Sequence, residues 1–580
     1  MPTRGKDETL LKAWISWEDG IGYLTDAKGI NGFYYANAIL GLQGELRPAP
    51  GLLGANTAGV PSRTPIAFAP TGDGAKAVQY WFEDTVLDGT EVEAYLYAVT
   101  NNSPAIGTAS IDSSISKLDL RNAAFGAVVT ADAITNSNAD APLGSPMRYQ
   151  GLWYVPGGRR VADATLTDIC QLTTIAVNGG ADTWTRSGAG ASPTTADHLA
   201  MLNFQGTKHL KNSGSSILAT NGNALLDSSW GSYNPVGDKN ERALAIQNLA
   251  DAMFVFNKEG LYSFNDKAQS GLVFSDFKYW RNVMREAAAT PFKGGLILGH
   301  PTGLQHYTPR SLPVSIGPDA RFSSLGLPPP GASTEFQNGR YHGVAIAGDF
   351  IYAIYQPTPQ GGSGTGSGKG RNGLILFGTP KGLIDPTSIT WQVIGNVNLY
   401  DKGLFSGCHV STVGFPEVTD QPSPTLWLSS SNAGATAAQL LRMNLDNRAT
   451  PFRARGETHL IALSGEAWMS ELTFPDPVDL QQLVVYTQDM ILGDEWLFGL
   501  LIDGRPVGSA VGPFSNTSEI TVGNIIQSNG RNKLEMDVRG THRVMLHIKY
   551  TFNETTGGTA AARVPPTIKR IELWGRPGAS

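Results

Sequence analysis

The 580-residue chain has little of what marks secreted, membrane-spanning or nucleic-acid-binding proteins. Its two cysteines, Cys170 and Cys408, are too few for a disulfide framework, so buried free thiols and a reducing cytoplasm are expected. Charged residues make up only 16% of the chain and the net charge is −6, so no nucleic-acid partner is expected. The first twenty residues lack the apolar core of a signal peptide, and no apolar run is long enough to cross a bilayer. The sequence therefore predicts a product made in a cytoplasm, without a signal peptide or membrane insertion.

The chain also lacks the short motifs that mark common active sites. It has no G-x-S-x-G, H-E-x-x-H or phosphate-binding loop, no cysteine pair with metal spacing, and no Ser-x-Asp-x-Gly-x-x-Trp box of sialidase-like propellers. His300, His306 and His342 lie close in sequence, but a zinc site would need them to converge with a carboxylate, and polar strand ends explain them as well. Asp319 is expected to be a turn residue. We therefore assign no catalytic, cofactor-binding or metal-binding residue, and expect no cofactor and no enzymatic activity.

Glycine and proline are abundant, at 68 and 35 residues, which predicts many turns and few long helices. The clearest stretch is Ala243–Asp266. Within it, Ala252–Phe256 is an apolar strand, Asn257–Gly260 a tight turn, and Leu261–Phe264 a second strand. A helix over the first half, with Ala243, Ile246, Leu249 and Met253 on one face, is the alternative.

The same order of strand, glycine turn and aromatic strand returns along the chain at intervals of roughly 45 to 60 residues, which is near the blade period of a propeller. Its clearest copies are at 77–99, 295–307, 344–355 and 425–445. We predict an all-β chain with a degenerate β-propeller of about seven blades, six to eight being compatible with the spacing. A string of β-sandwiches or a β-helix remains the alternative. One helix is expected, at 275–289, with Phe277, Trp280 and Met284 on one face.

The pattern of strand-like segments changes near Arg455. Seven short strands follow within about 120 residues, which is the spacing of an antiparallel β-sandwich of jelly-roll type. They are expected at 468–474, 483–486, 495–502, 519–522, 534–538, 544–550 and 568–574. The predicted organisation is an N-terminal arm or docking segment at 1–60, a propeller at 61–455 and a C-terminal sandwich at 456–580. The arm is expected to dock either on a later domain or on a neighbouring subunit.

Several of these stretches resemble structural proteins from the tails of tailed bacteriophages. The resemblance lies in the general sequence pattern and in the domain order rather than in a diagnostic motif. The likeness covers about residues 242–580 and rests on Met253–Phe264 (MFVFNKEGLYSF), Gly294–Tyr307 (GGLILGHPTGLQHY), Ile316–Asp319, Ala467–Phe474 and Pro565–Trp574. The resemblance implies a virion protein at the tail tip, nozzle or fibre-attachment region, made in the host cytoplasm. It implies other tail proteins and symmetric copies of the chain as partners, with host-surface attachment as a further role.

A protein of another class would suit the same scaffold. Twelve Trp, 18 Tyr and 22 Phe residues could supply stacking platforms for a glycan-binding or glycan-hydrolysing propeller, although aromatic residues in short strands usually pack in the sheet core. Two facing carboxylates would favour the hydrolase, and a flat aromatic shelf would favour the lectin.

Overall fold

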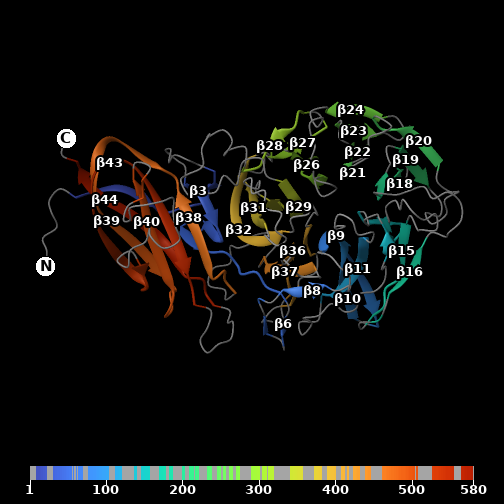
Figure 1. Ribbon diagram of the computed structural model, residues 1–580, viewed down its shortest axis with the longest axis horizontal. Coiled ribbons are helices and arrows are strands. Elements are labelled where there is room, and N and C mark those ends of the chain that lie inside the picture. The colour runs from blue at the N-terminus through green and yellow to red at the C-terminus, as the bar shows by residue number, and fades with distance from the viewer. Residues whose placement is uncertain are drawn as a thin grey trace.

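The chain forms two bodies, a ring of small sheets and a single large curled sheet that we call the terminal module (Figure 1). In this computed structural model all regular elements of the described residues are strands. The described part is the whole chain except residues 1–7, 23–30, 43, 55, 58–59, 62, 64, 69–75, 90, 103–110, 121–135, 140–144, 157–168, 178–179, 181, 187–198, 203–207, 214–215, 221–230, 238–244, 250–251, 257–259, 265–269, 275–288, 301–302, 310, 319–339, 357–370, 382–387, 400–406, 412–414, 417–421, 431–437, 446–459, 503–504, 507–524, 554–562 and 579–580.

The ring consists of blades, each an antiparallel sheet of four strands that run in sequence order from the first strand outward, except in blade 7. Blade 1 has β9 (Lys76–Asp88), β10 (Glu91–Asn102), β11 (Ile111–Asp119) and β12 (Asn136–Ala139), and blade 2 has β13 (Met147–Tyr149), β14 (Leu152–Pro156), β15 (Ile169–Thr174) and β16 (Thr183–Arg186). Blade 3 has β17 (Leu199–Leu202), β18 (Lys208–Ser213), β19 (Ser216–Thr220) and β20 (Gly231–Pro235), and blade 4 has β21 (Ala245–Leu249), β22 (Ala252–Phe256), β23 (Leu261–Phe264) and β24 (Ser270–Phe274). Blade 5 has β25 (Ala289–Phe292), β26 (Gly295–His300), β27 (Gly303–Tyr307) and β28 (Val314–Ser315), and blade 6 has β29 (Arg340–Ala347), β30 (Phe350–Gln356), β31 (Arg371–Pro380) and β32 (Ile389–Leu399). Blade 7 has β33 (Cys408–Val410), β36 (Thr425–Ser430), β37 (Ala438–Asn444) and, from far earlier in the chain, β8 (Ile66–Phe68).

The blades close into a circle. The first strands contact one another in the order β13, β17, β21, β25, β29, β33 and β9, and an ion pair between Arg148 and Asp84 joins blade 2 back to blade 1. Blade 7 is completed by β8, so its outermost strand precedes blade 1 in the sequence. The expected β-propeller is confirmed, and the described strands form seven four-stranded sheets.

Blade strands are buried on both faces, which explains their apolar sequences. In β10 the side chains of Tyr95, Tyr97 and Val99 pack towards blade 2, while Leu96 and Ala98 pack towards blade 7. Successive residues of a strand point to opposite faces, so one strand supplies apolar side chains to two inter-blade spaces.

Blade 4 shows the strand order that the sequence predicts. The strands β22 and β23 have the expected bounds and pair antiparallel, while residues 257–259 of the expected turn lie outside the described residues. Residues 245–249 form strand β21 antiparallel to β22, so the helical alternative is wrong there. The reason is tertiary: Leu249 packs with Phe254 in a cluster shared with blade 5. The helix expected at 275–289 lies outside the described residues except for Ala289, which begins β25.

The terminal module is one 12-stranded sheet made from both ends of the chain. Its N-terminal strands are β1 (Thr9–Trp14), β2 (Gly20–Ile21), β3 (Gly32–Asn37), β4 (Ile39–Leu42) and β5 (Glu45–Pro48). Its C-terminal strands are β38 (Ser464–Met469), β39 (Leu472–Gln488), β40 (Glu495–Ile502), β41 (Arg505–Pro506), β42 (Ile525–Ile526), β43 (Gly530–Thr551) and β44 (Thr567–Pro577). β1 and β5 pair with β44 and β3 pairs with β38, so the N-terminal segment docks on the C-terminal strands of its own chain. Two short ladders, β6 (Asn56–Thr57) with β7 (Val60–Pro61) and β34 (Phe415–Pro416) with β35 (Pro422–Ser423), stand apart from these sheets.

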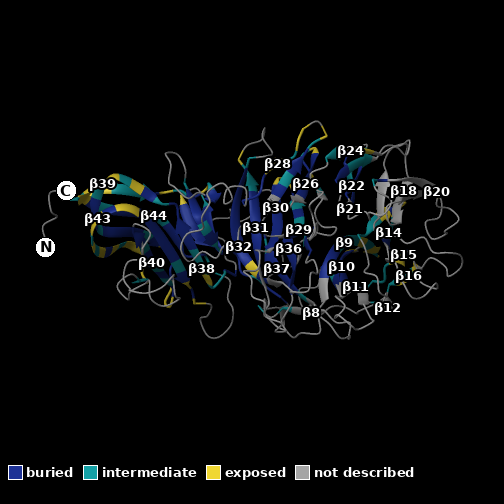
Figure 2. Ribbon diagram, turned by 45° about the horizontal axis from the view of Figure 1, so that its top comes forward, coloured by how far each residue is buried: buried dark blue, intermediate teal, exposed yellow. Residues whose placement is uncertain are grey.

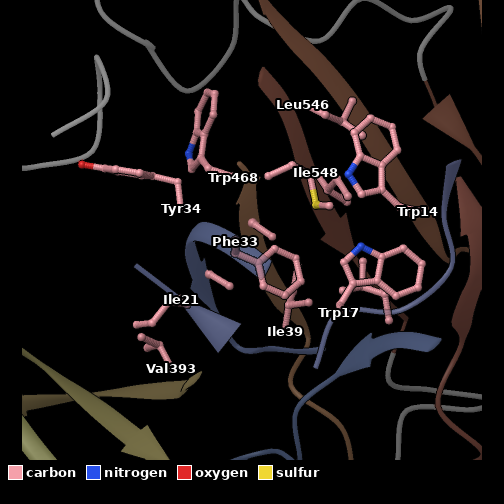
Figure 3. Close-up of a cluster of buried hydrophobic side chains, with 14 of the residues drawn as sticks. Trp14, Trp17, Ile21, Phe33, Tyr34, Ile39, Val393, Trp468, Leu546 and Ile548 are labelled. Carbon is pink, nitrogen blue, oxygen red and sulfur yellow. The ribbon is translucent and has the colours of Figure 1, made fainter. Parts of the chain in front are cut away.

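The sheet curls around a single core, and two of its strands, β43 and β39, are long enough to pair with several others. One half of β43 pairs with β38 and β40, the other half pairs with β39, and β39 continues to β44. The expected sandwich strands at 534–538 and 544–550 are thus two parts of one bent strand, whereas β40 has the predicted bounds and 519–522 lies outside the described residues. Figure 3 shows the core, where Trp14 of β1, Trp17 of the β1–β2 connection and Phe33 of β3 meet Leu546 and Ile548 of β43.

The module covers the outer edge of blade 6. β32, the last strand of that blade, contacts β2, β3 and β4, and Ala38 N donates a hydrogen bond to Val393 O at 2.9 Å. Gln392 makes paired hydrogen bonds with the backbone of Gly41, at 2.9 and 3.0 Å. An uncovered edge strand is open to pairing with other chains, and here that edge is buried (Figure 2).

Candidate functional site

Chemically active side chains of the described part gather on both faces of blade 1. On the face towards blade 7, His409 Nε2 lies 2.6 Å from Glu83 Oε1, and the ring of His409 lies nearly parallel to that of Trp81 at 6.5 Å between centroids. His409 is on β33 and Glu83 on β9, the first strands of two adjacent blades. The side chains are 26% and 10% exposed, so this pair is partly open to water.

The face of blade 1 towards blade 2 holds a more deeply buried polar cluster. Lys117 Nζ lies 2.6 Å from Asp182 Oδ1, with side-chain exposures of 6% and 4%. Tyr97 donates its hydroxyl proton to Asp182 Oδ2 at 2.7 Å. The Lys117 ammonium sits over the ring of Tyr95, 3.9 Å from the centroid, and the Tyr95 hydroxyl donates to Glu93. Two acids, two phenols and one amine thus lie together in a cluster with little exposed surface.

The hairpin between β15 and β16 brings Asp182 to this position. Within it, Gly180 N donates to Val177 O at 3.0 Å, and Ala176 N donates to Asp182 Oδ1 at 2.8 Å. The same turn presents Ala176 O to Lys117 Nζ at 2.5 Å. The loop of blade 2 is therefore fastened to blade 1 through one lysine and one aspartate.

Burial governs the acid–base state of this pocket. Burial, then the negative charge of Asp182 and the hydrogen bond to it, raise the pKa of Tyr97 far above its usual value. Tyr97 therefore stays a neutral donor to the carboxylate over the whole physiological range. Next to it, Arg148 and Asp84 are 3.7 Å apart, but Arg148 is 55% exposed, so this pair contributes little.

Two of the three histidines considered from the sequence, His306 and His342, have described side chains. His306 is buried, and its Nε2 lies 3.1 Å from Phe292 O, so this nitrogen carries the proton. His342 is buried on β29, and His300 ends β26 with its side chain outside the described part, as is all of Asp319. Within the described residues no group of three or more His, Cys, Asp or Glu could hold a metal ion.

The two clusters on blade 1 were not anticipated from the sequence. Glu83 and His409 are 326 residues apart, and Lys117 and Asp182 are 65 apart. The only local signal was a lysine within the strand Ile111–Asp119, at a position that faces the core. The first contact requires the closure of the ring and the second requires two blades to face each other, and no local pattern encodes either.

Comparison with known proteins gives a likeness of shape only. No protein family and no curated protein matches the chain. Among solved structures, virginiamycin B lyase from Staphylococcus aureus is 10% identical, with a TM-score of 0.32 over 63% of this chain and 95% of that one. An exo-β-1,3-galactanase from Phanerochaete chrysosporium is 10% identical (TM-score 0.26, 91% and 100% covered), and Trypanosoma rangeli sialidase is 12% identical (TM-score 0.28, 92% and 97% covered). At these values the likeness carries no argument about chemistry.

A search of the described residues for helices with the length and apolarity to cross a membrane finds none.

Proposed function

We propose that the protein is a structural component of a bacteriophage tail, at the tail tip, nozzle or fibre-attachment region, where it holds neighbouring tail proteins. Its site of action is then the virion, and it acts as a scaffold rather than as an enzyme. Attachment to the host surface is a further role of the same assembly.

The observation that supports this role is one hydrophobic core that runs through both bodies. The cluster around Trp17 and Trp468 of the terminal module also contains Trp391 of blade 6 and Leu304 of blade 5. The two bodies therefore form one rigid piece, and the first and last described strands, β1 and β44, pair within it. A protein that transmits force between neighbours needs such a joint, whereas a hinged enzyme does not.

The sequence resemblance supports the same proposal. The described residues of 253–264 and 294–307, which resemble phage tail proteins, lie on the central strands of blades 4 and 5. Residues 467–474 and 565–574 form parts of β38, β39 and β44 in the module. The stretches that resemble phage tail proteins thus lie on core strands of both bodies.

Co-expression tests the proposal. The full chain is produced together with the proteins encoded by the genes on either side of its own, purified, and examined by light scattering and electron microscopy. We expect a symmetric assembly that contains several copies of this chain with at least one of those proteins. A monomer that joins none of them contradicts the tail role.

A glycan assay distinguishes the scaffold role from the alternative, a glycan-binding or glycan-hydrolysing protein. The purified chain is incubated with host surface polysaccharide, and released reducing sugar is measured. Release that is lost in a Glu83→Gln or His409→Gln variant would replace the scaffold role with that of a glycan hydrolase. Binding without hydrolysis would leave the scaffold role standing and add attachment to it.

A further inference from the structure

We propose that Lys117 and Asp182 condense to an amide, so that an isopeptide bond joins blades 1 and 2. The bond forms within the chain itself, and it does not depend on the proposed tail role. A nitrogen–oxygen contact within a cluster of five buried side chains favours this reaction.

The two groups that would react are already in contact. Lys117 Nζ lies 2.6 Å from Asp182 Oδ1, the oxygen bonded to the carbon that it would attack, and both side chains are more than nine-tenths buried. Nζ is held from the other side by Ala176 O at 2.5 Å, and the Tyr95 ring lies 3.9 Å below it. Fixing a nucleophile and a carbonyl carbon in contact removes most of the entropic part of a bimolecular barrier.

The carboxyl group is held by hydrogen-bond donors on both of its oxygens. Its Oδ2 accepts the hydroxyl proton of Tyr97 at 2.7 Å, and its Oδ1 accepts the amide proton of Ala176 at 2.8 Å. Donors placed around a carboxyl oxygen stabilise the negative charge that builds up in a tetrahedral intermediate. Tyr97 stays protonated because of its burial, so that donor persists.

The step balances within the pair. One proton passes from Nζ to Asp182 through their contact, which leaves a neutral amine and a neutral carboxylic acid. The nitrogen lone pair attacks Cγ, and Oδ1 leaves with its own proton and one from the nitrogen, as water. The product is an amide N–H and one water molecule, without oxidant, metal or co-substrate. Because the two side chains have so little exposed surface, hydrolysis of the new amide is disfavoured.

Glu93 and Tyr95 are positioning residues in this scheme. The Tyr95 hydroxyl donates to Glu93, which is 2% exposed, and this bond fixes the ring under the ammonium. Neither side chain needs to exchange a proton with the reacting atoms.

Mass spectrometry of the purified full chain tests the inference. After incubation at neutral pH we expect an intact mass lower than that of the sequence by one water, about 18 Da. Trypsin should no longer cleave after Lys117, and a branched peptide should join the segments that carry Lys117 and Asp182. A wild-type chain that keeps its full mass and is cleaved at Lys117 overturns the proposal and leaves an ordinary buried ion pair.

Variants and an internal control make the result specific. Asp182→Ala and Lys117→Met should each show the mass of their sequence. Tyr97→Phe keeps both reacting groups and should lose water at least tenfold more slowly. If any of these variants fails to fold, the wild-type peptide map still decides. In that map Lys293 and Asp349, which lie 3.0 Å apart with Asp349 58% exposed, should remain unlinked, because their contact is open to water. A link there as well would show non-specific condensation and would count against the proposed site.

Discussion

At the scale of single residues, burial decides which groups can react. Cys408 lies on β33, and burial raises the pKa of its thiol to about 12 from its ordinary value of 9.0. The thiolate is the reactive form, so we expect neither Cys408 nor the buried Cys170 to react with a thiol reagent at pH 8 in the folded protein. Both should react once urea unfolds the chain. Rapid labelling of the native protein would contradict this assignment.

The same thiol has a consequence for stability. Because its folded pKa is raised, its contribution is fully present below pH 9 and is lost as the pH rises from 9.0 towards 12. A Cys408→Ala variant should therefore show less alkaline destabilisation than wild type in urea titrations.

Glu466 gives a pH dependence of opposite sign. Burial raises the pKa of this carboxyl, but its hydrogen bond to His547 and the charges of His547 and Lys549 outweigh that effect and lower it. A depressed pKa stabilises the fold above the ordinary value of 4.5, and this stabilisation is lost as the pH falls through the folded pKa. The side chain is 37% exposed, so the gain is screened and should stay below about 1 kcal/mol.

Acid unfolding of a Glu466→Gln variant measures this contribution. Below pH 4.5 the stability difference between wild type and variant should shrink. If the difference stays constant between neutral pH and about pH 3, the ion pair does not contribute to folding.

At the scale of elements, blade 7 depends on a strand from before blade 1. Leu440 on β37 is fully buried, pairs with Ile66 of β8 and packs with Trp427 against blade 1. Leu440→Ala should cost about 2–5 kcal/mol, since it leaves a cavity where the ring closes. Leu272→Ala on the outer strand of blade 4 is the matched control and should cost far less, because that side chain is 53% exposed. Equal losses in urea unfolding of the two variants would show that the closure is not tightly packed.

The joint between β2 and β32 requires a glycine. Gly20 has φ +73°, and a Cβ there would lie 2.3 Å from the carbonyl oxygen of Trp391. Gly89 also has a positive φ, +61°, but no atom lies within 4 Å of its Cβ position. Gly89→Ala should therefore cost only the backbone strain of about 1 kcal/mol, and Gly20→Ala clearly more. Thermal melts of both variants compare them, and equal costs would argue against the close contact.

The sequence predicted these elements where turns and local pairing set them. The hairpin of β22 and β23 and the strand β40 follow from short apolar runs bounded by Gly, Asn or Asp. Local patterns did not reveal that β1–β5 complete the sheet of the C-terminal strands, because that pairing spans most of the chain. The same holds for Lys117 with Asp182, since their contact exists only when two blades face each other.

At the scale of the whole molecule, the shared core predicts that ring and module unfold together. Trp391 has no exposed surface, lies on the strand between the two bodies, and donates its Nε1 proton to Ile316 O at 2.5 Å. It belongs to the cluster that also holds Trp17 and Trp468 of the module. Chains of this length often unfold in several steps, so a single transition would be informative.

Calorimetry of the full chain should show one transition, with equal calorimetric and van't Hoff enthalpies. Trp391→Ala should lower the stability by about 3–5 kcal/mol while the two bodies still melt together, because many other side chains bridge them. Phe254→Ala, which is buried in blades 4 and 5 away from the joint, is a control for a simple core loss. Two separate transitions in wild type would mean that the bodies are only tethered, and the argument for a rigid scaffold would fail with them.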